Sequence, residues 1–269
     1  MRKNIYEILN TRNIDIKKEY SRIYEMFYLQ PYNNGFNNAT LSEHISENFT
    51  QLNKKIIHRC LSLDDFNETY QFRFVEQPQN FDIEYVVSFA EYVTNLTYAF
   101  LRCGNTNFND KGLFDIINHI KDCMEDLGYQ FIEKEQIIIY VEKNPVAISV
   151  AENVSDELSY SVLEYNHYKL KGDLSNKKNI LKNMADDIEA ERKMLTSINK
   201  SFTSDLFQML NKFIRHDSSE NAYISNLQSI ELEQIYDEIY QMWLMAKMLL
   251  EQNKRNEFVR VILNKVNEI

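Results

Sequence analysis

Arg215 and His216 form the residue pair in this chain whose side chains are best suited to phosphate or acid–base chemistry. An arginine carries a permanent positive charge that can support a phosphate, and a histidine titrates near neutral pH and can act as a general acid or base. Asn211 lies one turn before Arg215 on the same predicted helix face, where its amide could orient the guanidinium. Asp205 and Glu191 are weaker candidates for acidic partners. A purely structural role is the alternative, because cations also stabilise the carbonyl end of a helix.

Two predicted helices hold this pair, one over residues 205–214 and one over residues 230–251, with a polar turn between them. Apolar residues recur in both with a helical period. Because the two apolar stripes match, we expect residues 203–214 and 230–251 to pack antiparallel. Arg215 would then be exposed, so the substitution Arg215→Ala should leave thermal stability nearly unchanged.

Composition favours a helical, acidic protein. The 269 residues are 44% hydrophobic and include only 5 glycines and 3 prolines, so tight turns are scarce and helices are favoured over many strands. The formal net charge of −10 argues against a protein that coats nucleic acid, since such proteins neutralise phosphates with a basic face. A small cleft that acts locally on RNA remains compatible with this charge.

The three cysteines, Cys60, Cys103 and Cys123, have no paired spacing, which predicts free buried thiols in a reducing compartment. The sequence shows no signal-peptide pattern and no apolar run of the roughly 20 residues needed to cross a bilayer. We therefore expect a cytoplasmic protein without a membrane partner.

Metal and cofactor sites are not expected. His119 and Cys123 lie four residues apart on one predicted helix face, but no third ligand is near them in sequence. His58 and Cys60 are an equally weak candidate for a pair of metal ligands. No phosphate-binding glycine loop, nucleophile elbow or zinc-protease motif is present.

The predicted architecture is a mainly α protein with a small β-hairpin near residues 129–150. An N-terminal helical region would cover residues 1–127, and a second helical region that includes the hairpin would cover residues 128–269. Residues 129–132, 136–141 and 146–150 are rich in β-branched and aromatic side chains, and residues 143–145 would form a hairpin turn between the last two. Further helices are expected at residues 14–29, 82–101, 113–127, 176–199 and 257–266. A capping box at residues 40–43 predicts a helix that extends to about residue 56, residues 62–65 predict another helix start, and a helix that begins at residue 155 should end at Gly172.

Four short runs carry a resemblance to a known family: residues 138–144, 164–168, 211–216 and 236–242. They resemble a group of bacterial proteins that accompany phage-defence, or abortive-infection, genes. That group is similar to the HEPN superfamily, whose members are helical bundles and in many cases RNases of abortive-infection and toxin systems. The resemblance implies a HEPN-like bundle in the C-terminal half.

The resemblance also implies a site, which this sequence matches incompletely. The HEPN motif is an arginine with a polar follower, and then a histidine after four to six further residues. Arg215 and His216 supply the first two positions. The histidine is expected at position 220, 221 or 222, where this sequence has Glu220, Asn221 and Ala222. Either His216 takes over the histidine's role or the site has lost its chemistry.

Two functions follow from these observations. The first is a metal-independent HEPN-type RNase of antiviral defence, which acts as a toxin on RNA. It would form a homodimer that joins two Arg215-His216 pairs, under the control of an antitoxin or a phage-derived trigger. The second is a non-catalytic HEPN-like helical interaction or sensor protein. RNA bound at Arg215 would favour the first, and an Arg215 locked in structural hydrogen bonds would favour the second.

Overall fold

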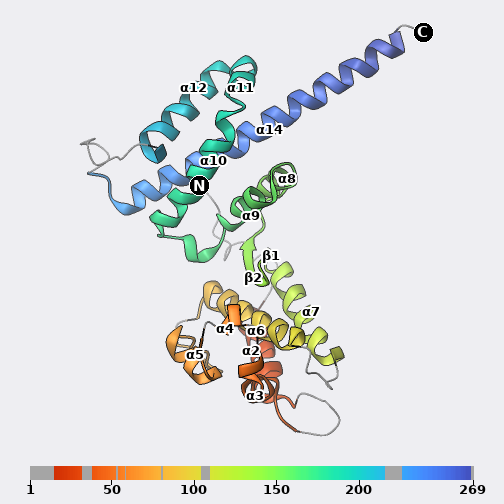
Figure 1. Ribbon diagram of the computed structural model, residues 1–269, viewed down its shortest axis with the longest axis vertical. Helices are drawn as coiled ribbons and strands as arrows, with labels where there is room; N and C mark the ends of the chain where they lie inside the picture. The colour runs from red at the N-terminus through yellow and green to blue at the C-terminus, as the bar shows by residue number, and fades with distance from the viewer. Residues whose placement is uncertain are drawn as a thin grey trace. The chain divides into compact units, whose positions relative to one another are not determined.

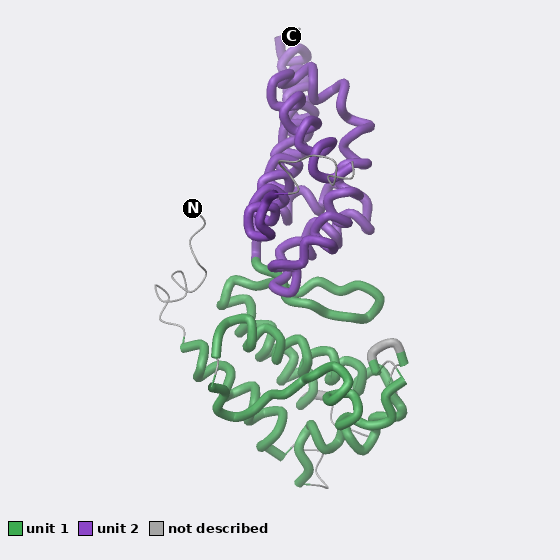
Figure 2. The backbone as a smooth tube through the Cα atoms, turned by 90° about the vertical axis from the view of Figure 1, so that its left-hand side faces the viewer, with its two compact units in different colours: residues 1–142 green, residues 143–269 purple. Residues whose placement is uncertain are grey.

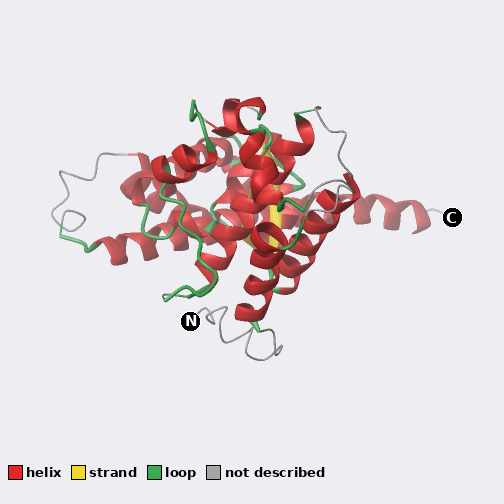
Figure 3. Ribbon diagram, turned by 90° about the horizontal axis from the view of Figure 1, so that it is seen from below, coloured by secondary structure: helices red, strands yellow, loops and turns green. Residues whose placement is uncertain are grey.

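The computed structural model describes residues 15–31, 38–52, 54–57, 59–79, 81–103, 110–215 and 226–267. Within these residues the chain is mainly helical and has one two-stranded antiparallel sheet (Figures 1 and 3). The prediction of a mainly α protein with a small β-hairpin is therefore confirmed. None of the described helices is long and apolar enough to cross a membrane.

The chain divides into two compact units, residues 1–142 and residues 143–269, here called unit 1 and unit 2 (Figure 2). The sequence placed the division near residue 127. The predicted and observed boundaries differ in where they place the hairpin. It belongs to unit 1, because its strands contact the helices α6 and α7 of that unit.

Unit 1 is built around α6 (Ile83–Arg102). The side chain of Asp82 caps this helix by accepting a hydrogen bond from the backbone amide of Tyr85 at 2.8 Å. Twelve of its residues are buried, so α6 is covered on most of its surface. The other elements of unit 1 are α2 (Ile16–Tyr24), η1 (Glu25–Leu29), α3 (Leu41–Glu47), η2 (Phe49–Gln51), α4 (Lys54–Ile57), α5 (Leu63–Thr69), α7 (Asp110–Asp126), β1 (Tyr129–Lys134) and β2 (Ile137–Glu142).

Side chains of α6 satisfy the free edge of β2. The carboxylate of Glu91 accepts a hydrogen bond from the amide of Tyr140 at 2.8 Å. Asn95 bonds both backbone groups of Ile138, at 2.7 Å to the carbonyl oxygen and at 2.8 Å to the amide. A buried strand edge otherwise leaves unpaired donors and acceptors, so these two polar side chains satisfy three backbone groups on the outer edge of β2.

The hairpin turn lies at Glu135 and Gln136, not at the predicted residues 143–145. Both residues have positive φ, 51° and 72°, as a two-residue turn between twisted strands requires. Such turns are usually recognised by asparagine or glycine at these positions, and this sequence has neither. The turn was therefore missed.

Residues 146–150, predicted as a strand, lie instead in the helix α8 (Pro145–Ala151). Asn144 is its N-cap and accepts hydrogen bonds from the amides of Val146 at 3.1 Å and Ala147 at 3.2 Å. Pro145 occupies the first helical position, where its missing N–H costs nothing. The Asn144-Pro145 pair, predicted to lie in a turn between two strands, is thus a helix start.

Unit 2 packs its helices around a core that includes the fully buried Trp243. Its longest element is α14 (Ser229–Asn267), a single helix of 39 residues that replaces the two helices predicted at 230–251 and 257–266. The predicted helix 176–199 is instead broken at residues 190–191, where no proline or glycine marks the interruption. The other elements are α9 (Asp156–Glu164), η3 (Tyr168–Leu170), α10 (Leu174–Glu189), α11 (Arg192–Ile198), α12 (Lys200–Met209) and η4 (Leu210–Arg215).

α14 packs against both α10 and α12. It runs opposite to α12, as the matching stripes predicted (Figure 1). It runs parallel to α10, because contacts between the two helices advance along both chains together. These contacts join Lys177 to Asp237, Met184 to Trp243 and Asp187 to Lys247.

Candidate functional site

Arg215 is the last residue of η4, a π-helical turn that continues α12. Its guanidinium lies against α10: Nη2 donates to the carbonyl oxygen of Ala185 at 2.7 Å, and Nη1 donates to the carboxylate of Glu189. Asp186 Oδ1 lies 3.8 Å from Nη2. Only 25% of the Arg215 side chain is exposed. Arg215 is therefore held in hydrogen bonds that join η4 to α10, and it is less exposed than the sequence suggested.

The acidic neighbours of Arg215 offset its charge. Glu189 accepts a hydrogen bond from Arg215 and a second from Arg192 at 3.1 Å. The hydrogen bond from Arg215 is the main reason that the pKa of Glu189 lies below its ordinary value. A phosphate group approaching Arg215 would have to compete with the carboxylates of Glu189 and Asp186 for the same donors.

The other predicted site residues divide into two groups. Asn211 lies in the same π-helical turn and is partly buried, and no side-chain hydrogen bond joins it to Arg215 within the described part of the chain. His216 and Asn221 lie outside the described residues. The structure thus brings Arg215 together with Ala185, Asp186 and Glu189, which lie 26 to 30 residues earlier in the sequence.

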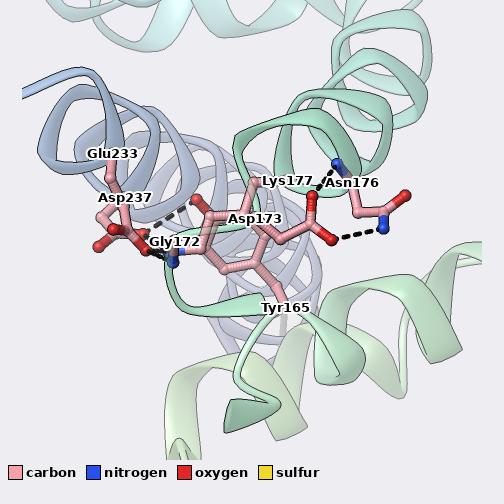
Figure 4. Close-up of polar contacts among 7 residues, drawn as sticks. All are labelled: Tyr165, Gly172, Asp173, Asn176, Lys177, Glu233 and Asp237. Atoms are coloured by element: carbon pink, nitrogen blue, oxygen red, sulfur yellow. Dashed lines mark hydrogen bonds and ion pairs between the residues drawn. The ribbon is translucent and has the colours of Figure 1, made fainter. Parts of the chain in front are cut away.

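A second polar arrangement, centred on Lys177 of α10, was not identified from the sequence (Figure 4). The Lys177 side chain is 7% exposed, and its Nζ lies 2.8 Å from Glu233 Oε1 and 2.9 Å from Asp237 Oδ1. The hydroxyl of Tyr165 donates to the same Asp237 oxygen at 3.0 Å. Glu233 also accepts from the backbone amide of Gly172 at 2.7 Å. We call these five residues the Lys177 network.

The network is neutralised internally to a large extent. Burial opposes the ionisation of Glu233, but the Gly172 amide and Lys177 outweigh it and hold the pKa of this carboxyl below its ordinary value. Burial, reinforced by Asp237, raises the pKa of the Tyr165 phenol, so Tyr165 stays protonated and acts as a donor. The Lys177 ammonium also lies 5.2 Å from the centre of the Tyr165 ring, within cation–π range. Each charged group therefore has a partner, as a structural network requires.

Two of the runs that carried the family resemblance, residues 164–168 and 236–242, lie together at this network. The ring of Tyr165 stacks on Tyr240 with 4.1 Å between centroids and 10° between planes. The Tyr240 hydroxyl donates to the carbonyl oxygen of Val162 at 2.8 Å and accepts from Asn166 at 2.9 Å. The residues of these runs are thus used in packing α9 and its following turn against α14.

No group of three or more His, Cys, Asp or Glu side chains that could hold a metal occurs among the described residues. A surface pocket in unit 2 is lined by residues of α8, of the turn that follows it and of α14, among them Ser149, Asn153 and Lys254, but not by Arg215. No family model, curated protein or solved structure matches the chain.

Proposed function

We propose that this chain is a non-catalytic helical interaction protein whose unit 2 presents the C-terminal part of α14 to a protein partner. The observation that carries this proposal is an apolar surface on an unsupported helix. Every residue from Lys254 to Asn267 is exposed, and Figure 1 shows this part of α14 extending beyond the other helices of unit 2. Its exposed apolar side chains are Phe258, Val259, Val261, Ile262, Leu263 and Val266, at 44–67% exposure.

Such a surface is unfavourable unless something covers it. Apolar side chains on a soluble helix normally face a core, and contiguous exposed apolar patches mark interaction sites. The apolar residues of this segment cover slightly more than half of the helix circumference, with Lys265 among them, and Arg260, Asn264 and Asn267 lie on the remaining side. An amphipathic helix end of this kind fits a groove or another helix of a partner protein.

The environment of Arg215 supports the non-catalytic part of the proposal. A catalytic arginine offers its donors to the substrate, whereas two hydrogen bonds of this guanidinium already go to the Ala185 carbonyl and the Glu189 carboxylate. Its role in this arrangement is to fix η4 against α10.

Site-specific photo-crosslinking in living cells that express the protein tests the proposal. A photoreactive phenylalanine derivative replaces Ile262 on the apolar side of α14, and in a matched control it replaces Asn264 on the polar side. The proposal predicts a discrete protein adduct from position 262 and little or none from position 264. No adduct from either position, or equal adducts from both, would reject it.

A second candidate is the metal-independent HEPN-type RNase of antiviral defence. The observation that favours it is the π-helical turn of η4, which contains Asn211 and ends at Arg215, because such turns are frequent at functional sites. A homodimer would bring two Arg215-His216 pairs to one RNA, and an antitoxin or phage-derived trigger would control the toxin. Expression in a bacterial host tests it: growth arrest that Arg215→Ala relieves and Lys212→Ala does not would support the RNase.

A further inference from the structure

Exposed residues on α14 follow a heptad repeat that begins within the body of unit 2 and continues to its end. Seven residues follow one another at alternating intervals of three and four: Met245, Met248, Gln252, Arg255, Val259, Ile262 and Val266. The apolar members are exposed, Met245 by 55%, Met248 by 40%, and the last three by 44–63%. Alternation of three and four is the spacing of the contact positions of a coiled coil. We call these residues the heptad stripe.

The heptad stripe runs beside the face of α14 that packs into its own bundle, and its member Met248 lines a surface pocket with Ser149 and Val150 of α8. Trp243, Ala246 and Leu250 point into the core of unit 2 and are at most 2% exposed. The heptad positions nearest to them in sequence, Met245 and Met248, remain exposed. From Gln252 to Val266 every member of the stripe is exposed, so a second helix can lie along this part without displacing the bundle. Residues 245–266 span about 33 Å of helix, enough for six turns of contact.

The charges on α14 select both the partner and its direction. Two copies of the stripe in parallel would place Arg255 against Arg255 of the second copy, which is repulsive in the contact layer. In an antiparallel pair, each of the two kinds of contact position on one copy faces the other kind on the second copy, so Arg255 can lie opposite Val259. The same register sets Glu251 opposite Lys265 at both ends and places the two Phe258 side chains against each other.

We propose that the heptad stripe is a self-association surface on which the same stripe of a second copy of this chain lies antiparallel, with Glu251 of each copy paired to Lys265 of the other. This proposal rests on the proposed function, since it identifies the partner of α14 as the chain itself. Gln252 and Arg255 lower the stability of the pair but favour one register, as single polar residues do in coiled coils. Arg255 can keep its charge at the edge of the contact, because it donates to Glu251 on its own helix at 3.1 Å.

Charge reversal with the full chain tests the register. Light scattering after size-exclusion chromatography should give twice the 32.1 kDa of one chain for the wild type. Glu251→Lys or Lys265→Glu alone turns both end pairs repulsive and should raise the dimer dissociation constant about tenfold or more. An equimolar mixture of the two variants should restore dimers, because each heterodimer regains two opposite-charge pairs. The control variants Glu257→Lys and Arg260→Glu, outside the predicted contact, should dimerise as the wild type does.

Three outcomes would overturn this proposal: a monomeric wild type, no effect of either reversal, or failure of the mixture to recover dimers. Because Glu251 also contacts Arg255, circular dichroism checks that each variant is folded, and Ile262→Asp supplies a second disruption at an exposed position. A monomeric wild type that sediments with phosphatidylserine-containing vesicles would assign the stripe to a membrane surface instead. A monomeric wild type that still forms a photo-adduct with another protein from position 262 would reject self-association and leave the proposed function standing.

Discussion

Arg215 donates a hydrogen bond from Nη2 to the main-chain carbonyl of Ala185, 2.7 Å away, so the residue with the strongest catalytic signature in the sequence connects η4 to α10. The same guanidinium bonds Glu189, the last residue of α10. These contacts join η4 to α10, so we expect Arg215 to contribute to the stability of unit 2.

The substitution Arg215→Ala should lower the free energy of unfolding by about 1–2 kcal/mol, because it removes charge-assisted hydrogen bonds that are partly shielded from water. The matched control is Lys193→Ala, an exposed cation of the neighbouring helix α11, which should change stability by less than about 0.5 kcal/mol. Urea denaturation of the three proteins measures both differences. Equal stability of Arg215→Ala and wild type would show that these hydrogen bonds do not stabilise unit 2.

The stabilising effect of Arg215 should depend on pH in the acid range. Because the pKa of Glu189 is lower in the folded chain than in the unfolded chain, the pair stabilises the fold above the ordinary carboxyl pKa. That contribution is lost as the pH falls through the folded pKa. The stability difference between wild type and Arg215→Ala should therefore be constant from pH 6 to 7 and shrink toward pH 3. A difference that grows on acidification would contradict this assignment.

Lys177→Met should destabilise the protein by about 3 kcal/mol, because it leaves Glu233 and Asp237 without their buried cation. The control is Lys182→Met, an exposed lysine of the same helix, which should change stability by less than about 0.5 kcal/mol. Combining Lys177→Met with Asp237→Asn should recover part of the loss by removing one uncompensated charge. If Lys177→Met is as stable as wild type, the Lys177 network is not what holds α10 to α14.

Cys123 should resist thiol reagents in the folded protein. Burial, with a smaller effect of Glu19, raises the pKa of its thiol to about 12, so little thiolate exists at pH 8. Cys103, which is only partly buried, should react with iodoacetamide first. Mass spectrometry of labelled peptides in buffer and in urea gives the order of reaction. Labelling of Cys123 before Cys103 in buffer would contradict the packing around α7.

The sequence predicted those elements whose caps and apolar residues lie within one short segment of the chain. The helix α6 could be predicted because its Asp82 cap and its apolar residues lie within one segment. The hairpin turn at Glu135 and Gln136 could not, because neither residue is typical of the positive φ that it adopts. The Asn144-Pro145 pair was ambiguous, since the same residues can end a strand or begin a helix.

The candidate site was harder to predict because its contacts are distant in sequence. Arg215 was singled out by residue type, but its partner Glu189 is 26 residues away, and no periodic pattern connects the two. The partners of Lys177 are 56 and 60 residues away, so the network became visible only when α10 and α14 were packed side by side. The extent of α14 was missed because its exposed second half does not share the buried face of the first.

Cleavage of labelled single-stranded RNA by the purified full chain tests most directly whether Arg215 is structural or catalytic. Wild type, Arg215→Ala and the exposed-lysine control Lys212→Ala are compared in buffer with EDTA. We predict no cleavage by wild type beyond that seen with Arg215→Ala. EDTA-resistant cleavage by wild type and Lys212→Ala that is lost in a folded Arg215→Ala protein would contradict the non-catalytic account and establish the RNase.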